Sequence, residues 1–379
     1  MNDATTIPLV DLRAQTRSLR AEVEVAWAGC LERCDFVQGE ETRRFEDEFA
    51  GFLGARHVIG VGSGLDALTL ALDGLGVGPG DSCVVPANTF VATALAASRL
   101  GARIAWCDVD PVTRVLSAET LERALAALPP ALRPAAVLPV HLCGRAVPAE
   151  VFELCAARGI PVVEDAAQSH GARFEDRTFT GTRGRLGCFS FYPGKNLGAW
   201  GDGGAIATGD DELAARARRA RHYGQRAKYE HVELGTNSRL DSLQAAVLRV
   251  KLRRLPAWNR AREDAAGRYE DLLATAVPEA GRPALAPAGQ HAWHLYRIEC
   301  RDPEHRRRVA AGLALRGIET GMHYPIPCHR QACYAGGRSD APDLSVSEAE
   351  ALRTLSLPIF PEITPEQQAR VAEALRLVW

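Results

Sequence analysis

The feature that most constrains the fold is an alternation of short apolar runs with helical patterns between residues 57 and 209. The runs are apolar throughout rather than at every second position, which is typical of strands buried on both faces of a sheet. The seven predicted strands lie in the segments HVIGV, SCVVPA, RIAWCDV, AAVLPVHL, IPVVEDAA, RLGCFSFY and GAIATG. Strands that alternate with helices form crossover units, so we expect an α/β domain with a mainly parallel seven-stranded sheet.

Beyond residue 211 the pattern becomes helical and charged, and one long helical segment at 243–273 contains Pro256. A proline inside a helix removes a backbone donor, so we expect this helix to kink or split there. The elements expected after it are a strand within HLYRIEC, a helix near 303–316 and a final helix at 364–378. We therefore predict a large domain over residues 1–250, with an N-terminal helical segment, and a smaller α+β domain over 251–379.

The charge balance favours a small-molecule ligand over nucleic acid or a membrane. The formal net charge is -2 and the pI is about 6.6, so no strongly basic field is available. No apolar run reaches the ~18 residues of a membrane span, and no leader pattern is present at the start. The ten cysteines lack the C-x-x-C spacing of zinc or redox sites. We expect a cytoplasmic protein with reduced thiols and no metal.

Lysine is rare in this chain. The 45 basic residues are 42 arginines and three lysines, Lys195, Lys228 and Lys251. An amine can lose its proton and act as a nucleophile, whereas the guanidinium group stays charged. Lys195 follows the predicted strand RLGCFSFY in a glycine-rich loop, where ligands of α/β folds bind. A solvated surface lysine is the alternative, but its position and rarity make Lys195 a candidate nucleophile.

The first predicted strand leads into the segment GVGSGLDALTLAL, in which glycines and Ser63 precede a helix. The free N–H groups of a helix N-terminus favour a phosphate. A dinucleotide-binding fingerprint would need glycine at position 65, which is Leu65. The segment therefore indicates a single phosphate, or simply a turn with Ser63 as a helix cap.

Asp165 ends the apolar run IPVVEDAA, where an unpaired carboxylate would be costly to bury. Its partner is either an arginine or the protonated ring nitrogen of pyridoxal 5'-phosphate, PLP. Gln168 is close enough to contact the phenolic oxygen of that ring if the chain turns there. The phosphate turn, the strand-end aspartate and the loop lysine follow one another in the order that a PLP enzyme with the aspartate-aminotransferase-like fold requires.

The chain resembles the DegT/DnrJ/EryC1/StrS family of PLP-dependent sugar aminotransferases over nearly its whole length, most specifically around Lys195. The segments that carry the resemblance are GSGLDALTLAL, VVPANTFVATALA, VVEDAAQSHGA, FSFYPGKNLGAWGDGGAI, HYGQRAKYEHVELGTNSRLDSLQAAVL and HYPIPCH. It implies fold type I, with a large PLP-binding domain and a smaller C-terminal domain. It also implies that Lys195 forms the Schiff base with the cofactor, that Asp165 pairs with the pyridine nitrogen and that Gln168 contacts the phenolic oxygen.

Further cofactor contacts follow from the same resemblance: Ser63, Gly64 and Ser190 at the phosphate, Phe90 on the ring face, and Asn237 of the neighbouring subunit at the phosphate. A homodimer with shared active sites is thus implied. Taken alone, Phe90 fits core packing equally well, and Asn237 fits a turn. His323 and Tyr324, in a polar loop, are candidates for contact with the sugar, its phosphates or the amino donor.

The expected reaction moves an amino group from an amino acid, with glutamate the first choice, to a ketone on a nucleotide-linked sugar. The resemblance favours a dTDP-3-keto-6-deoxyhexose, with a C-4 ketone or a cyclitol ketone as alternatives. A PLP-dependent dehydratase is a rival, but the dehydratases considered have histidine in place of the Schiff-base lysine. A nicotinamide-dependent oxidoreductase is disfavoured by Leu65, and a non-catalytic regulator by the lack of a basic DNA-reading element.

Overall fold

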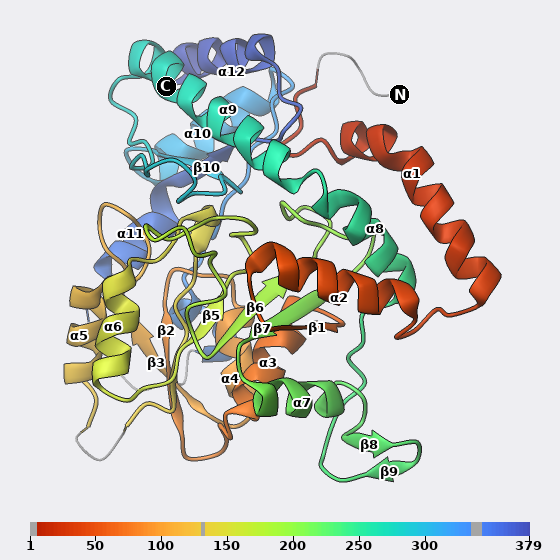
Figure 1. Cartoon of the computed structure of the whole chain (residues 1–379). Coiled ribbons are helices and arrows are strands. Elements are labelled where there is room, and N and C mark those ends of the chain that lie inside the picture. The colour runs from red at the N-terminus through yellow and green to blue at the C-terminus, as the bar shows by residue number, and fades with distance from the viewer. Residues whose placement is uncertain (1–5, 130–132, 335–342) are drawn as a thin grey trace.

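The computed structural model describes residues 6–129, 133–334 and 343–379. A sheet with helices packed around it forms the larger body, and a smaller group of elements from the C-terminal part of the chain lies at one end (Figure 1). Within the described ranges, none of the helices combines the length and apolar composition of a membrane span.

The large sheet is assembled from two hydrogen-bonded groups, β1-β7-β6-β5 and β3-β2-β4. Parallel bridges from Val137 to Val162 and from Val140 to Asp165 join the groups between β4 and β5. Strand β7 is antiparallel to β1 and β6, whereas the other neighbours are parallel. The strands are β1 (His57–Val61), β2 (Ser82–Pro86), β3 (Arg103–Cys107), β4 (Ala136–Val137), β5 (Val163–Asp165), β6 (Leu186–Ser190) and β7 (Gly204–Thr208). The predicted mainly parallel, seven-stranded sheet is confirmed.

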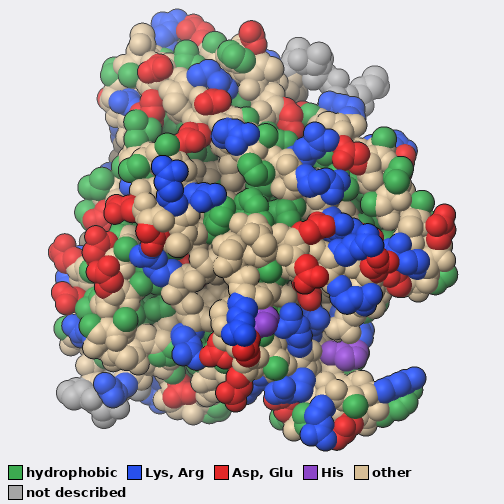
Figure 2. Space-filling model, viewed as in Figure 1, with side chains coloured by type: hydrophobic (Ala, Val, Ile, Leu, Met, Phe, Trp, Pro, Cys, Tyr) green, Lys and Arg blue, Asp and Glu red, His purple; other side chains and the backbone are tan. Residues whose placement is uncertain are grey.

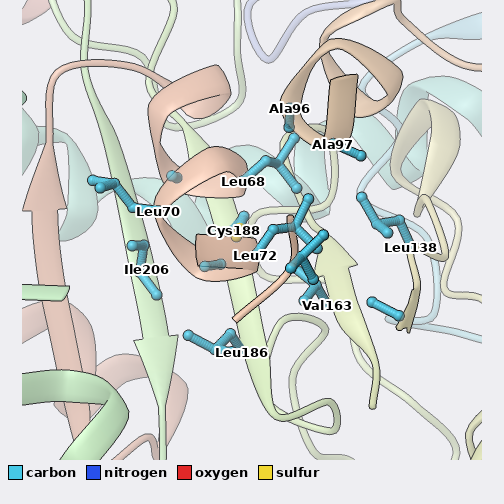
Figure 3. Close-up of a cluster of buried hydrophobic side chains, with 14 of the residues drawn as sticks. Leu68, Leu70, Leu72, Ala96, Ala97, Leu138, Val163, Leu186, Cys188 and Ile206 are labelled. Carbon is cyan, nitrogen blue, oxygen red and sulfur yellow. The ribbon is translucent and has the colours of Figure 1, made fainter. Parts of the chain in front are cut away.

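Helix α3 (Gly64–Gly74) lies at the centre of the core on one side of the sheet. Its Leu68 and Leu72 belong to one buried cluster with Val163, Leu186 and Ile206 from three adjacent strands (Figure 3). Burial of a leucine side chain contributes about 1.5–3 kcal/mol relative to leaving it exposed. This packing holds the N-terminus of α3 beside the ends of the strands.

The other helices of this body are α1 (Leu12–Arg33), α2 (Glu40–Leu53), α4 (Ala92–Arg99), α5 (Ala118–Ala126), α6 (Ala149–Ala157), α7 (Asp211–Ala220) and α8 (Ser242–Leu252), with a 3₁₀ turn η1 (Leu142–Gly144). Aromatic side chains pack α2 against the strand and loop that lead to Lys195. Phe49 meets Phe189 with ring centroids 5.1 Å apart, and Phe45 meets Phe191 at 5.3 Å. The main chain on both sides of Ser190 is therefore anchored in a core.

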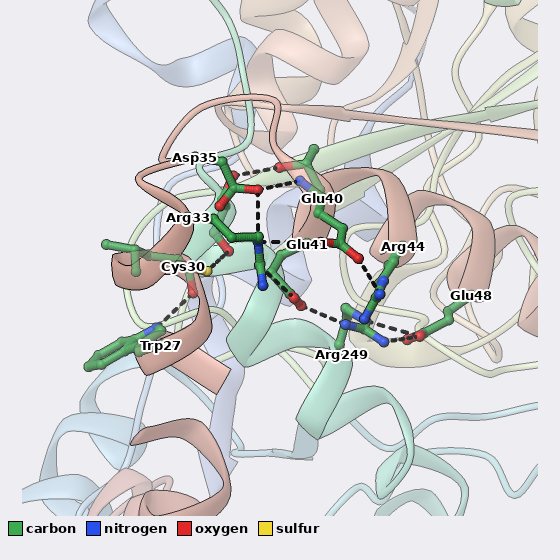
Figure 4. A network of polar contacts seen from close by, with 12 residues as sticks. Trp27, Cys30, Arg33, Asp35, Glu40, Glu41, Arg44, Glu48 and Arg249 are labelled. Carbon is green, nitrogen blue, oxygen red and sulfur yellow. Dashed lines mark hydrogen bonds and ion pairs between the residues drawn. The ribbon is translucent and has the colours of Figure 1, made fainter. Parts of the chain in front are cut away.

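An ionic network joins the end of α1 and helix α2 to α8 (Figure 4). Arg249 on α8 donates to Glu41 at 2.6 Å and to Glu48 at 2.5 Å. Glu41 also accepts a hydrogen bond of 3.2 Å from Arg33. Because Glu41 is nearly buried between two guanidinium groups, loss of either arginine would leave its charge poorly compensated.

Helix α9 (Leu255–Ala276) follows α8 and has Pro256 in its first turn, where proline is tolerated. The predicted split at Pro256 is confirmed.

The remaining elements of the C-terminal part are β10 (Tyr296–Glu299), α10 (Pro303–Ala314), η2 (Cys328–Arg330), η3 (Ala332–Tyr334), α11 (Ser345–Arg353), β11 (Thr354–Leu357) and α12 (Pro365–Val378). Strands β10 and β11 pair antiparallel, and Tyr269, Tyr296 and Leu357 share a separate core that also takes in Ile7. The division of the chain near residue 250 stays a prediction.

Strands β8 (Gln225–Ala227) and β9 (Glu230–His231) form a hairpin that projects from the larger body (Figure 1). Tyr229 is 82% exposed and Leu234, just beyond the hairpin, is 97% exposed. On the face shown in Figure 2, acidic and basic side chains are interspersed over the surface. The projecting hairpin thus carries exposed apolar side chains next to charged ones.

Candidate active site

Several of the residues predicted from the sequence lie where β5 and β6 end and α3 begins. Asp165 is the last residue of β5 and pairs with Cys188 on β6. Ser190 ends β6, and Lys195 lies in the loop beyond it, where its amide donates to the carbonyl of Tyr192 at 2.9 Å. The packing of three adjacent elements therefore brings together groups that are far apart in the sequence.

Asp165 is buried, with 6% of its surface exposed. Its Oδ1 accepts a hydrogen bond from the amide of Ala167 at 3.1 Å, and its Oδ2 accepts one from the hydroxyl of Thr93 at 2.7 Å. No arginine forms an ion pair with this carboxylate within the described part of the chain. Lone pairs on both oxygens remain available to a positively charged partner.

Lys195 has the electrostatic character of a reactive amine. Burial lowers its pKa to about 8, against an opposing influence from Asp165 and Cys143. Among the described residues, none is hydrogen-bonded to its amine. Near neutral pH an appreciable fraction of this amine is therefore unprotonated, as a nucleophile or a proton carrier requires.

Gln168 joins the segment after β5 to the loop that carries Tyr324. Its Oε1 accepts a hydrogen bond of 2.6 Å from the amide of Cys143, which orients the side-chain amide. Its Nε2 then donates to the hydroxyl of Tyr324 at 2.9 Å. The ring of Phe90, 53% exposed, lies 5.4 Å from the ring of Tyr324 between centroids. Phe90 therefore does not serve as a core residue but faces an open space beside Tyr324.

His323 lies next to Tyr324, and its Nδ1 is 2.8 Å from the hydroxyl of Ser356. Burial, followed by the charges of Arg297 and Lys195, lowers the pKa of His323 to about 4. The imidazole is therefore neutral at physiological pH. It can donate or accept a hydrogen bond without adding charge to the site.

The turn between β1 and α3 has the shape of a phosphate cradle. The hydroxyl of Ser63 accepts a hydrogen bond from the amide of Asp66 at 3.1 Å and caps α3. A Cβ atom at Gly64 would lie 2.6 Å from the Cβ of Ser190. Only glycine permits this approach, which places Ser190 against the N-terminus of α3 as an anion site requires.

Asn237 lies apart from this group on an exposed stretch of chain. The next residue, Ser238, is buried and accepts a hydrogen bond from Gly62 at 2.9 Å while donating to Asp66 at 2.9 Å. The segment that carries Asn237 is thus attached to the base of the cradle in its own chain. Its side chain remains free to face a second molecule.

Sequence reasoning missed the residues that hold the site in shape. Asn196, 3% exposed, donates to the carbonyl of Ala292 at 2.7 Å and to Asn259 at 3.1 Å, and so fixes the loop next to Lys195. Thr93 lies on α4 and reaches Asp165. The only signal in the sequence was that both residues adjoin segments already singled out, the Lys195 loop and the turn at Phe90.

This arrangement fits PLP. A glycine cradle closed by Ser190 suits its phosphate, and the open face of Phe90 suits a flat ring. The free lone pairs of Asp165 suit a protonated ring nitrogen, and Lys195 presents an amine of lowered pKa for an aldehyde. The residues present would therefore hold this cofactor.

Comparison with known proteins agrees with the geometry. A sequence model of the DegT/DnrJ/EryC1/StrS aminotransferase family matches residues 18–376. The chain belongs to this family. It is an aminotransferase, and the sequence-based assignment to this family is confirmed.

Three similar proteins illustrate the match. The dTDP-3-amino-3,4,6-trideoxy-alpha-D-glucose transaminase of Streptomyces venezuelae is 44% identical over 371 residues, which cover 98% of this chain and 95% of that protein. The crystal structure of DesV from S. venezuelae, in complex with a ketimine intermediate, has a TM-score of 0.92 and 43% identity, and the match covers 99% of this chain and 98% of that one. NtdA from Bacillus subtilis, solved with bound cofactor PMP, has a TM-score of 0.88 and 29% identity, and the match covers 100% of this chain and 86% of that one.

Proposed function

We propose that this aminotransferase uses PLP to move an amino group from an amino acid, glutamate as first choice, to the C-3 ketone of a dTDP-3-keto-6-deoxyhexose. The product would be a dTDP-3-amino sugar. The observation that carries the catalytic part is Lys195, an amine with a pKa of about 8 at the strand ends beside Asp165. The choice of sugar is supported by the 44% identity to a transaminase named for a dTDP-3-amino sugar.

When bound, PLP supplies an electron sink for negative charge that develops on the substrate carbon. In this proposal Asp165 holds the ring nitrogen in its protonated state and Phe90 covers one face of the ring. Ser63, Gly64 and Ser190 bind the phosphate through hydroxyl and backbone N–H groups. Gln168 contacts the phenolic oxygen, and its existing bond from Cys143 keeps the amide turned so that Nε2 is the donor on that side.

Lys195 would carry the proton of the reaction at Nζ. A group with a pKa of about 8 exists in both protonation states near neutral pH, so it can take a proton from one atom and return it to another. Tyr324 and His323 stand on the substrate side. Burial raises the pKa of Tyr324, so its hydroxyl stays protonated and can donate to a sugar or a carboxylate.

A homodimer with shared sites is part of the proposal. Asn237 is exposed and follows a stretch of chain that presents Tyr229 of the hairpin and Leu234 to the outside. A second copy of the chain that covers these apolar side chains would receive Asn237 at its phosphate. Measurement of the molecular mass in solution tests the proposed homodimer separately from the reaction.

The function is tested with the purified enzyme converted to its amino form by glutamate, which should bleach the absorbance of the bound cofactor. Addition of dTDP-3-keto-6-deoxyhexose should then restore that absorbance, while the 4-keto isomer should not. Recovery with the 4-keto sugar alone would move the amination to C-4 and keep the enzyme class.

Two other results would change the proposal more deeply. If glutamate bleaches the absorbance and neither sugar restores it, the acceptor is another ketone, such as a cyclitol. If the protein with added PLP never shows an absorbance that borohydride removes, the cofactor assignment is wrong.

A further inference from the structure

Asp165 makes one hydrogen bond to a side chain in the described part of the chain, and that side chain is Thr93. Thr93 lies on α4, is fully buried, and stands 72 positions from Asp165 in the sequence. Its Oγ1 lies 2.7 Å from Oδ2 of Asp165, a short distance typical of a hydroxyl that donates to a carboxylate. The contact therefore connects the start of α4 to the end of β5.

The direction of this hydrogen bond follows from the number of protons available. Thr93 Oγ1 is also 3.2 Å from the carbonyl of Phe90 and 3.0 Å from the hydroxyl of Thr89. A hydroxyl has one proton, and the carboxylate at 2.7 Å is the nearest and the only charged acceptor. Thr93 thus donates to Asp165, and Thr89 supplies the proton in the contact between the two threonines.

The same residue is attached to the turn that carries Phe90. The amide of Thr93 donates to the carbonyl of Phe90 at 3.2 Å, while its side chain holds Asp165. Phe90 and Asp165 are two of the residues expected to meet the cofactor ring, one at its face and one at its nitrogen. Thr93 therefore connects them through its backbone and its side chain.

We propose that Thr93 is a positioning residue that sets the rotation of the Asp165 carboxylate relative to the ring position defined by Phe90. Thr89 supports it by donating a hydrogen bond to the Thr93 hydroxyl. The inference rests on the proposed function, because it assumes that Asp165 holds the ring of PLP. Thr93 itself touches neither the cofactor nor the substrate in this account. With Oδ1 held by the Ala167 amide and Oδ2 by Thr93, the carboxylate has one orientation in which its remaining lone pairs face the site.

The experiment compares three variants in the full-length protein, stripped of cofactor and titrated with PLP. Thr93→Val removes the hydroxyl at nearly constant volume, Thr93→Ser keeps it, and Thr89→Val removes only the second hydroxyl. Loss of a hydrogen bond to a charged group should weaken PLP binding about tenfold to a hundredfold in Thr93→Val. Thr93→Ser should bind as the wild type does, and Thr89→Val should lie in between.

A spectroscopic readout separates positioning from simple packing. The absorbance spectrum of the bound cofactor changes with pH, and the midpoint of that change should shift in Thr93→Val. In Thr93→Ser the midpoint should equal that of the wild type. Wild-type affinity and an unmoved pH profile in Thr93→Val would overturn the inference, as would a Thr93→Ser variant as weak as Thr93→Val. If the valine variant does not fold, Thr93→Ala takes its place against Thr93→Ser with the same expected outcomes. Failure of the wild type to bind PLP would instead refute the proposed function.

Discussion

Lys195 and Lys251 have the same lowered pKa in two regions of very different character. Burial lowers the pKa of each to about 8. Lys251 lies in the last turn of α8 and is 1% exposed, with Glu362 as the charge that opposes the shift. Lys195 lies in a loop at the strand ends, with Asp165 as the opposing charge. A lowered pKa therefore marks burial, and it indicates a reactive site only where other functional groups converge.

The surroundings of the two amines make this difference concrete. Around Lys195 stand a carboxylate with free lone pairs, an amide oriented by Cys143 and a glycine cradle. Lys251 lies on a packed helix whose other buried residues include Val247, Leu248 and Leu252. The third lysine, Lys228, is exposed on the β8–β9 hairpin, with its amine 5.2 Å from the ring centroid of Tyr229. Lys228 therefore serves as an exposed control for both Lys195 and Lys251.

The largest expected difference between Lys195 and Lys251 is in turnover. Lys195→Arg should keep the fold and lower the rate of sugar amination at least about a thousandfold, because a guanidinium group cannot act as the nucleophile. Lys251→Met should stay within about threefold of the wild type, because no role in the reaction is assigned to it. Single-turnover rates measured on both variants would contradict the comparison if they fell equally.

A second effect concerns stability and should appear at Lys251. Its pKa is about 8 in the folded state against 10.5 as the reference value, so the unfolded state binds more protons between these two pH values. Stability of the wild type should therefore rise with pH across this window relative to Lys251→Met. At pH 7 the methionine variant should be more stable by up to about 3 kcal/mol, and the advantage should fade toward pH 10.5.

Urea unfolding of Lys251→Met at pH 7 and pH 9.5 measures this effect, with Lys228→Met as the exposed control. The control should change stability by less than about 0.5 kcal/mol at both pH values. An advantage of Lys251→Met that is equal at both pH values would show that packing, and not the charge, is responsible.

The smallest expected effect is in chemical labelling of the cofactor-free protein. Modification of Lys195 by a small amine-reactive reagent should increase about tenfold from pH 7 to pH 9, because the neutral fraction rises through a pKa of about 8. Lys251, although similar in pKa, should remain unlabelled while the protein is folded, since it is buried. Peptide mass spectrometry measures the labelling of each lysine separately. Equal labelling of Lys195 and Lys251 would contradict the predicted difference in accessibility.

Much of the fold could be predicted from the chain alone. Each of the seven predicted strands lies in its expected segment, and the break between α8 and α9 falls beside Pro256. The fourth strand is shorter than its apolar run suggests, at two residues, and Pro139 in that run has no N–H to donate to a neighbouring strand. Proline thus accounts for both the break between α8 and α9 and the short fourth strand.

The candidate site was predictable in part, since Asp165, Gln168, Lys195 and the cradle stand in motifs of contiguous residues. Thr93 and Asn196 were not predictable, because each acts through a partner distant in the sequence, Asp165 for one and Ala292 for the other. Nothing in a helical pattern distinguishes a threonine that faces a carboxylate from one that faces a leucine. The roles of all these residues stay predictions until the variants are measured.

The sequence by itself determined the elements of this protein and their order, because hydrophobic periodicity, glycine and proline act over a few residues. It also determined the glycine at position 64, without which Ser190 could not approach the start of α3. The tertiary structure alone decided that Lys251 is enclosed by packed helices, and which hydroxyl holds the aspartate. Those outcomes depend on how α3, α4 and α8 pack against the sheet, since hydrogen bonds and burial are set by distances between residues far apart in the chain.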